Sequence, residues 1–157
     1  MTHRDAVRNV RHAEREIKRL ELLYGAYDLG GGRRCGDQFC NFKNGLYEGK
    51  YVGDCSWLQG LTCEMLGIKL STPPSLTWTG SLYKEGKAGK GKLYTLFVKD
   101  PEDTEGHSIG CFHHHLKDRW FECGGSDNPH PNNGVTFWKP TAERIAEFPY
   151  RRHFEGY

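Results

Sequence analysis

Residues 54–67 have the sequence Asp-Cys-Ser-Trp-Leu-Gln-Gly-Leu-Thr-Cys-Glu-Met-Leu-Gly, which predicts the helix around which the fold is arranged. Asp54 can cap its start by accepting a free backbone N–H, and Gly67 is a typical stop signal. The apolar side chains recur at three- and four-residue steps and define one buried face: Trp57, Leu58, Leu61, Met65 and Leu66. We therefore expect a helix over residues 55–66.

The chain before this helix predicts a longer amphipathic helix at about residues 3–23. Its apolar positions also follow the helical period: Ala6, Val10, Ala13, Ile17, Leu20 and Tyr24. Thr2 and Asp5 can cap its start. Residues 28–53 are rich in Gly, Arg, Asn and Lys without periodicity, so we expect a long loop or small insertion there, with the insertion at about 32–53.

The chain after this helix predicts strands. Short runs of aromatic, β-branched or apolar residues, each bounded by turn formers, occur at 93–98, 107–112 and 119–123, with further candidates at 135–138 and 149–154. Helices therefore precede strands along the chain. This order predicts an α+β fold with N-terminal helices packed on an antiparallel sheet.

Length and composition are typical of a single globular domain. The chain has 157 residues, of which 36% are hydrophobic and 27% charged, and its mean hydropathy is −0.74. No stretch approaches the roughly 18 apolar residues of a membrane span, and the start lacks the apolar segment of a signal peptide. We expect a monomer that is made in the cytoplasm and does not insert into a membrane. A net charge of +2 does not require nucleic acid as a partner.

Cys55 is the strongest candidate for a nucleophile. A cysteine in the first turn of a helix lies at the positive end of the helix dipole, which favours the thiolate. His107 opens a predicted strand and can act as its base, and Glu122 on the next strand can orient the imidazole. The alternative is that Cys55 is a small core residue and His107 a strand histidine with its hydrogen bonds satisfied.

Three stretches together resemble a known family. They are Gly-Ala-Tyr-Asp-Leu-Gly-Gly at 25–31, Asp-Cys-Ser-Trp-Leu at 54–58 and Gly-His-Ser-Ile-Gly at 106–110. The order resembles the NlpC-type cell-wall cysteine peptidases, in which a Tyr-x-x-Gly-Gly segment precedes an Asp-Cys-Ser helix start and a His-containing strand. Residues 70–73 and 150–154 are similar to further family segments. The resemblance covers nearly the whole chain and implies a papain-like fold.

The resemblance also implies the roles of individual residues. Cys55 would be the nucleophile and His107 the general base and then acid. Tyr27 would lie near the oxyanion, with Asp54 and Ser56 beside the substrate. The family usually has histidine where this chain has Glu122.

This chain departs from the family pattern in three further places. The segment before Asp54 is longer than usual, and Trp57 stands where glycine is common. The hairpin after His107 is lengthened and carries histidines at 113–115, any of which could compete with Glu122.

The activity implied by the resemblance is cleavage of a stem-peptide amide bond in bacterial peptidoglycan, commonly between D-glutamate and diaminopimelate. The thiolate would form a thioester that water hydrolyses, with no cofactor or metal. A small enzyme of this kind without a signal peptide is typical of a phage lysis enzyme or tail component. It would be made in the host cytoplasm and act on the cell wall.

Two other functions fit parts of the sequence. A zinc-stabilised binding module could use Cys35 and Cys40, together with Cys111, Cys123 and the histidines at 113–115, although the spacing of this set is irregular. An amidase or acyltransferase could use the same Cys-His pair, because that pair serves any acyl transfer. Simpler interpretations are that Cys63 and Cys111 are core residues and that the three histidines form a solvated turn.

Overall fold

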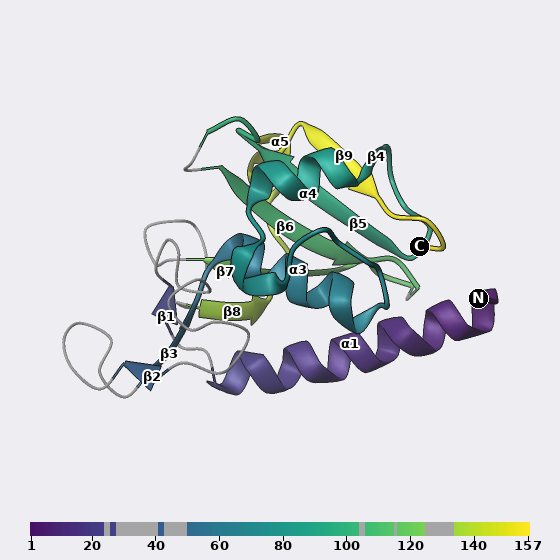
Figure 1. Ribbon diagram of the computed structural model, residues 1–157, viewed down its shortest axis with the longest axis horizontal. Coiled ribbons are helices and arrows are strands. Elements are labelled where there is room, and N and C mark those ends of the chain that lie inside the picture. The colour runs from purple at the N-terminus through teal and green to yellow at the C-terminus, as the bar shows by residue number, and fades with distance from the viewer. Residues whose placement is uncertain (24–25, 28–40, 43–49, 104–105, 115, 125–133) are drawn as a thin grey trace.

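A six-stranded antiparallel sheet forms the centre of the protein (Figure 1). The computed structural model describes residues 1–157 except for 24–25, 28–40, 43–49, 104–105, 115 and 125–133. All neighbouring strands of the sheet are antiparallel. In spatial order they are β4 (Lys87–Ala88), β9 (Tyr150–His153), β5 (Tyr94–Lys99), β6 (His107–Phe112), β7 (Arg119–Gly124) and β8 (Gly134–Phe137).

Helices cover the sheet. The long helix α1 (His3–Leu23) and the helix α3 (Cys55–Met65) pack side by side on one face, as Figure 1 shows. Thr2 and Asp5 cap α1, because the Asp5 N–H donates to Thr2 Oγ1 at 3.1 Å and the Thr2 N–H donates to Asp5 Oδ2 at 3.1 Å. The shorter elements are η1 (Pro74–Leu76), α4 (Thr79–Glu85) and α5 (Ala142–Ala146).

Alternation along the strands divides the core between the two faces of the sheet. The larger part lies under α1 and α3 and includes Leu96, Phe112, Phe121, Cys123 and Val135 from the strands. The smaller part lies on the opposite face, where Ile145 of α5 and Phe148 just after it pack on residues of the strands. These strand residues are Phe97, Ile109, Cys111 and Trp120. Cys111 and Cys123 therefore lie on opposite faces of the sheet.

A second, three-stranded sheet is formed by one strand just before residues 28–53 and two strands within them. Its central strand β3 (Lys50–Gly53) pairs in parallel with β1 (Ala26–Tyr27) and antiparallel with β2 (Asn41–Phe42). The expectation of a long loop or small insertion over 28–53 did not include β2 and β3, because strands this short show no alternation in the sequence. Residues 28–40 and 43–49 of the expected insertion lie outside the described residues.

The mixed α+β class expected from the sequence is confirmed. The helix predicted at 3–23 has those limits, and the helix predicted at 55–66 differs by one residue at its end. The predicted strands agree to within one residue at each end. Neither α4 nor α5 was predicted, because each is too short to show the helical period. None of the helices in the described part of the chain is long and apolar enough to cross a membrane.

Candidate active site

Cys55 is the first residue of α3, and the preceding residue caps that helix. The Trp57 N–H donates to Asp54 Oδ1 at 2.8 Å, and the Ser56 hydroxyl lies 3.4 Å from the same oxygen. Asp54 and Ser56, which were predicted to lie beside the substrate, thus hold the turn that carries the thiol. This turn places Cys55 at the positive end of the helix dipole.

The turn into β6 brings His107 to this helix start. Cys55 Sγ lies 3.8 Å from the carbonyl oxygen of Gly106, the residue before His107. A side chain at Gly106 would meet the Asp100 carbonyl oxygen at 2.4 Å, so only glycine fits this close approach. Cys55 and His107 are both buried, at 2% and 6% exposure.

Cys55 and His107 form an electrostatic pair. Burial raises the pKa of the Cys55 thiol, but the charge of His107 and its hydrogen bond to the sulfur outweigh burial, so the pKa lies below its ordinary value. Burial lowers the pKa of His107, but the charge and hydrogen bond of Cys55, followed by those of Glu122, raise it to about 9. Both directions favour a thiolate–imidazolium pair at neutral pH.

Glu122 contacts the imidazole. Its Oε2 lies 3.3 Å from His107 Nε2, and the Glu122 side chain is 1% exposed. Because β6 and β7 are antiparallel neighbours, the carboxylate reaches His107 across the hairpin. Because Nε2 faces Glu122, the other ring nitrogen, Nδ1, is available to exchange a proton with Cys55.

A buried arginine, which was not predicted, lies close to the same Glu122 oxygen that faces His107. Arg144 Nη2 lies 3.6 Å from Glu122 Oε2, and Arg144 Nη1 lies 2.8 Å from Glu147 Oε2. The guanidinium also lies 5.0 Å from the ring centre of Phe148. Arg144 comes from α5, so the sequence offered no pattern that connects it with Cys55.

Two hydroxyl groups lie near the thiol. Burial raises the pKa of Tyr27 well above its ordinary value, and the charge of Cys55 and a hydrogen bond to it act in the same direction. The Tyr27 ring centre lies 6.5 Å from that of His107. Thr79 Oγ1, at the start of α4, lies 3.9 Å from Cys55 Sγ. The structure therefore places Tyr27 near Cys55 and His107, as the motif predicts. It also places Thr79, which was not predicted, near the Cys55 thiol.

Of the hairpin histidines that the structure describes, neither His113 nor His114 contacts His107. His113 Nδ1 lies 2.9 Å from Asp118 Oδ1, and His114 Nε2 lies 2.9 Å from Glu14 Oε1. Their side chains are 6% and 5% exposed, so the expectation of a solvated turn is wrong for both. Asp118 belongs to the same hairpin as His113, whereas the partner of His114, Glu14, comes from α1, which local sequence does not reveal. His115 lies outside the described residues.

The remaining cysteines divide into buried and undescribed ones. Cys63 and Cys111 are fully buried, as expected for core residues, and both are free thiols. The zinc set that combined Cys111 with Cys123 is not formed, since they lie on opposite sheet faces. Cys35 and Cys40, the other candidate zinc ligands, lie outside the described residues.

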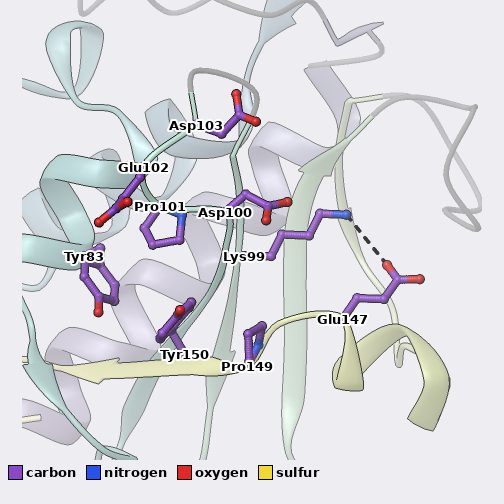
Figure 2. A pocket seen from close by; sticks show the side chains of 9 residues that line it. All are labelled: Tyr83, Lys99, Asp100, Pro101, Glu102, Asp103, Glu147, Pro149 and Tyr150. Carbon is purple, nitrogen blue, oxygen red and sulfur yellow. Dashed lines mark ion pairs between the residues drawn. The ribbon is translucent and has the colours of Figure 1, made fainter.

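A pocket of about 770 Å³ lies at the end of β5 (Figure 2). Lys99, the cross-strand partner of His107, lines it and forms an ion pair with Glu147 at 3.7 Å. Because Glu147 also binds Arg144, a chain of charged groups links this pocket to Glu122. Most of the other lining residues are acidic or aromatic: Tyr83, Asp100, Glu102, Asp103 and Tyr150.

Comparisons with known proteins leave the family open. No family model, no curated protein and no solved structure matches this chain. The case for a function therefore rests on the motifs and on the geometry around Cys55.

Proposed function

We propose that this protein is a cysteine peptidase that cleaves a stem-peptide amide bond of bacterial peptidoglycan. One observation carries the proposal: a buried thiol at the start of a helix lies 3.8 Å from the carbonyl oxygen of Gly106, the residue before His107, and Glu122 lies 3.3 Å from Nε2 of that imidazole. This is the nucleophile, base and orienting group that acyl transfer through a thioester needs.

The first half of the reaction transfers the acyl group to sulfur. The Cys55 thiolate attacks the carbonyl carbon, a C–S bond forms, and the carbonyl electrons move to oxygen. Backbone N–H groups at the start of α3 and the Tyr27 hydroxyl are donors for this oxyanion. The His107 imidazolium donates its Nδ1 proton to the amide nitrogen, the C–N bond breaks, and the amine leaves.

The second half releases the acid. Neutral His107 removes a proton from water, the resulting hydroxide attacks the thioester carbonyl, and the C–S bond breaks to regenerate the thiolate. His107 is again an imidazolium, which the Glu122 carboxylate stabilises. Burial of all three groups strengthens these charge interactions, because little water screens them.

The substrate class comes from the resemblance. The residues of its three motifs, Tyr27, Cys55 and His107, are distant in sequence, yet the first and second both interact with the third. Their meeting at one point supports the motif-based assignment. The choice of peptidoglycan over another amide depends on the motifs themselves.

The test is mass spectrometry of diaminopimelate-type peptidoglycan after incubation with the protein. We expect new stem-peptide termini with the unmodified chain and none with Cys55→Ala. Cys63→Ala is the matched control, since Cys63 is also a buried thiol of α3 but belongs to the core, and it should retain the products. Products that persist in Cys55→Ala, or no products from any of the three proteins, would contradict the proposal.

A further inference from the structure

A second cluster of chemically active side chains lies at the other end of β6 from His107. Cys111 is near the end of β6, His113 follows that strand, and Asp118 immediately precedes β7. Their ligand atoms, one from each residue, all lie within 4.8 Å of one another. Cys111 is four residues beyond His107, which is about 13 Å along a strand, so this cluster is separate from the candidate active site.

Cys111 and Asp118 both lie near the same ring nitrogen of His113. Cys111 Sγ lies 3.8 Å from His113 Nδ1, and Asp118 Oδ1 lies 2.9 Å from the same nitrogen. Thr95, the cross-strand neighbour of Cys111, holds the opposite nitrogen, with its Oγ1 2.7 Å from Nε2. The Thr95 hydroxyl is itself positioned by the Gly91 N–H, which donates to it at 3.0 Å.

This arrangement does not suit a catalytic triad. In a Cys-His-Asp relay the thiol and the carboxylate contact opposite nitrogens of the imidazole, so that a proton can pass through the ring. Here Cys111 and Asp118 both face Nδ1. Three ligand atoms within 4.8 Å of one another, with the far imidazole nitrogen held by a hydroxyl, fit a metal-binding set instead.

Two of the three ligand spacings lie close to those of a tetrahedral zinc site. Bond lengths of about 2.3 Å to sulfur and about 2.0 to 2.2 Å to nitrogen or oxygen place tetrahedral ligand atoms roughly 3.3 to 3.6 Å apart. The distances of 3.8 Å and 2.9 Å to His113 Nδ1 lie a few tenths of an ångström on either side of that range. Thiolate, imidazole and carboxylate are all zinc ligands.

We propose that Cys111, His113 and Asp118 bind a zinc ion. The thiol and the imidazole approach from the buried side, and the Asp118 side chain is 43% exposed, so a fourth position on the solvent side is left for water. The ion would connect the end of β6 with the start of β7, and these same two strands carry His107 and Glu122. The proposal does not depend on any chemistry at Cys55.

The test is a titration of the full-length chain with Co²⁺, which takes zinc sites and absorbs in the near ultraviolet when a thiolate binds it. The chain carries Cys55→Ala, so that the active-site thiol does not compete. We expect one Co²⁺ per chain, a thiolate-to-cobalt band, and loss of that band when Zn²⁺ is added. Cys111→Ser should abolish the band, and Asp118→Asn should weaken Co²⁺ binding about tenfold or more.

Two controls separate this site from other thiols. Cys123→Ser, on the opposite sheet face, and a Cys35→Ser/Cys40→Ser double variant should both keep the band. Asp118→Asn removes one ligand charge at a partly exposed position, so it tests the site even if Cys111→Ser fails to fold. The proposal is wrong if the chain binds no Co²⁺, if Asp118→Asn binds it unchanged, or if the Cys35/Cys40 variant loses the band.

Discussion

Arg144 and Glu122 form an ion pair inside the protein, with Nη2 and Oε2 3.6 Å apart and side-chain exposures of only 2% and 1%. A buried carboxylate is costly unless an opposite charge or hydrogen bonds compensate for it. Arg144 supplies such a charge, and its Nη2 approaches the same oxygen, Oε2 of Glu122, that faces His107. We therefore regard Arg144 as a positioning residue that keeps a charged Glu122 against the imidazole.

Arg144→Met should lower both stability and turnover. Removing one partner of a buried ion pair costs about 3 to 5 kcal/mol of unfolding free energy. Urea unfolding measures this loss, and Arg4→Met, at an exposed position of α1, should change the same quantity by less than about 0.5 kcal/mol. Because Arg144 acts through Glu122, kcat should fall while KM stays nearly constant, and Arg144→Lys should restore part of kcat. An unchanged kcat in Arg144→Met would contradict the positioning role.

Glu122→Gln should lower kcat/KM by about a hundredfold or more, because a neutral amide does not stabilise the imidazolium and can favour the wrong tautomer. Circular dichroism of the variant should remain that of the unmodified chain. Glu16→Gln, at a half-buried position of α1 that is distant in sequence from the site, is the matched control and should keep full activity. If Glu122→Gln retains full kcat/KM, Glu122 does not orient His107.

The pH dependence of kcat/KM should have a maximum with two limbs. Activity should fall as the pH rises through about 9, because His107 then loses the proton that the leaving amine needs. It should also fall at low pH, where the thiolate takes up a proton, and the lowered pKa of Cys55 places this limb below the range of an ordinary thiol.

Alkylation by iodoacetamide measures the thiolate directly. The rate at Cys55, followed by peptide mass spectrometry, should already be high at neutral pH and should decrease in His107→Ala. Cys63 is an internal control in the same sample, because burial raises the pKa of its thiol and should keep it unreactive. A Cys55 rate that follows the titration of a free cysteine would contradict the ion pair.

Gly110→Ala should destabilise the contact between α3 and β6. A Cβ atom at this position would lie 2.4 Å from the Phe121 ring and 2.6 Å from Gln59 Oε1. Overpacking of this kind costs about 1 to 3 kcal/mol, which thermal or urea unfolding can measure.

Ser108→Ala on the same strand is the comparison for Gly110→Ala. In the described part of the chain the buried Ser108 hydroxyl has no hydrogen-bond partner, so its removal should leave stability unchanged or slightly raised. A Gly110→Ala variant as stable as Ser108→Ala would show that α3 can move away from the sheet at no cost.

Helices and strands whose apolar side chains recur at the helical or strand period could be predicted from the sequence. The stripe of α1, the cap at Asp54 and the alternation in β5, β6 and β7 depend on residues within a few positions of one another, and the structure confirms those elements. Cys55 and His107 were candidates because a helix start and a strand start are recognisable locally. Glu122 was placed on the correct strand by the same alternation.

Contacts between distant segments were decided only by the tertiary structure. Thr79 and Arg144 belong to helices too short to show a period, and they reach the site because α4 and α5 fold back onto the sheet. The hairpin histidines looked solvated in sequence, yet His114 is buried against Glu14, a hundred positions earlier. Burial and charge pairing depend on which segments meet in space, and the local period that predicts a helix or a strand carries no information about its partner.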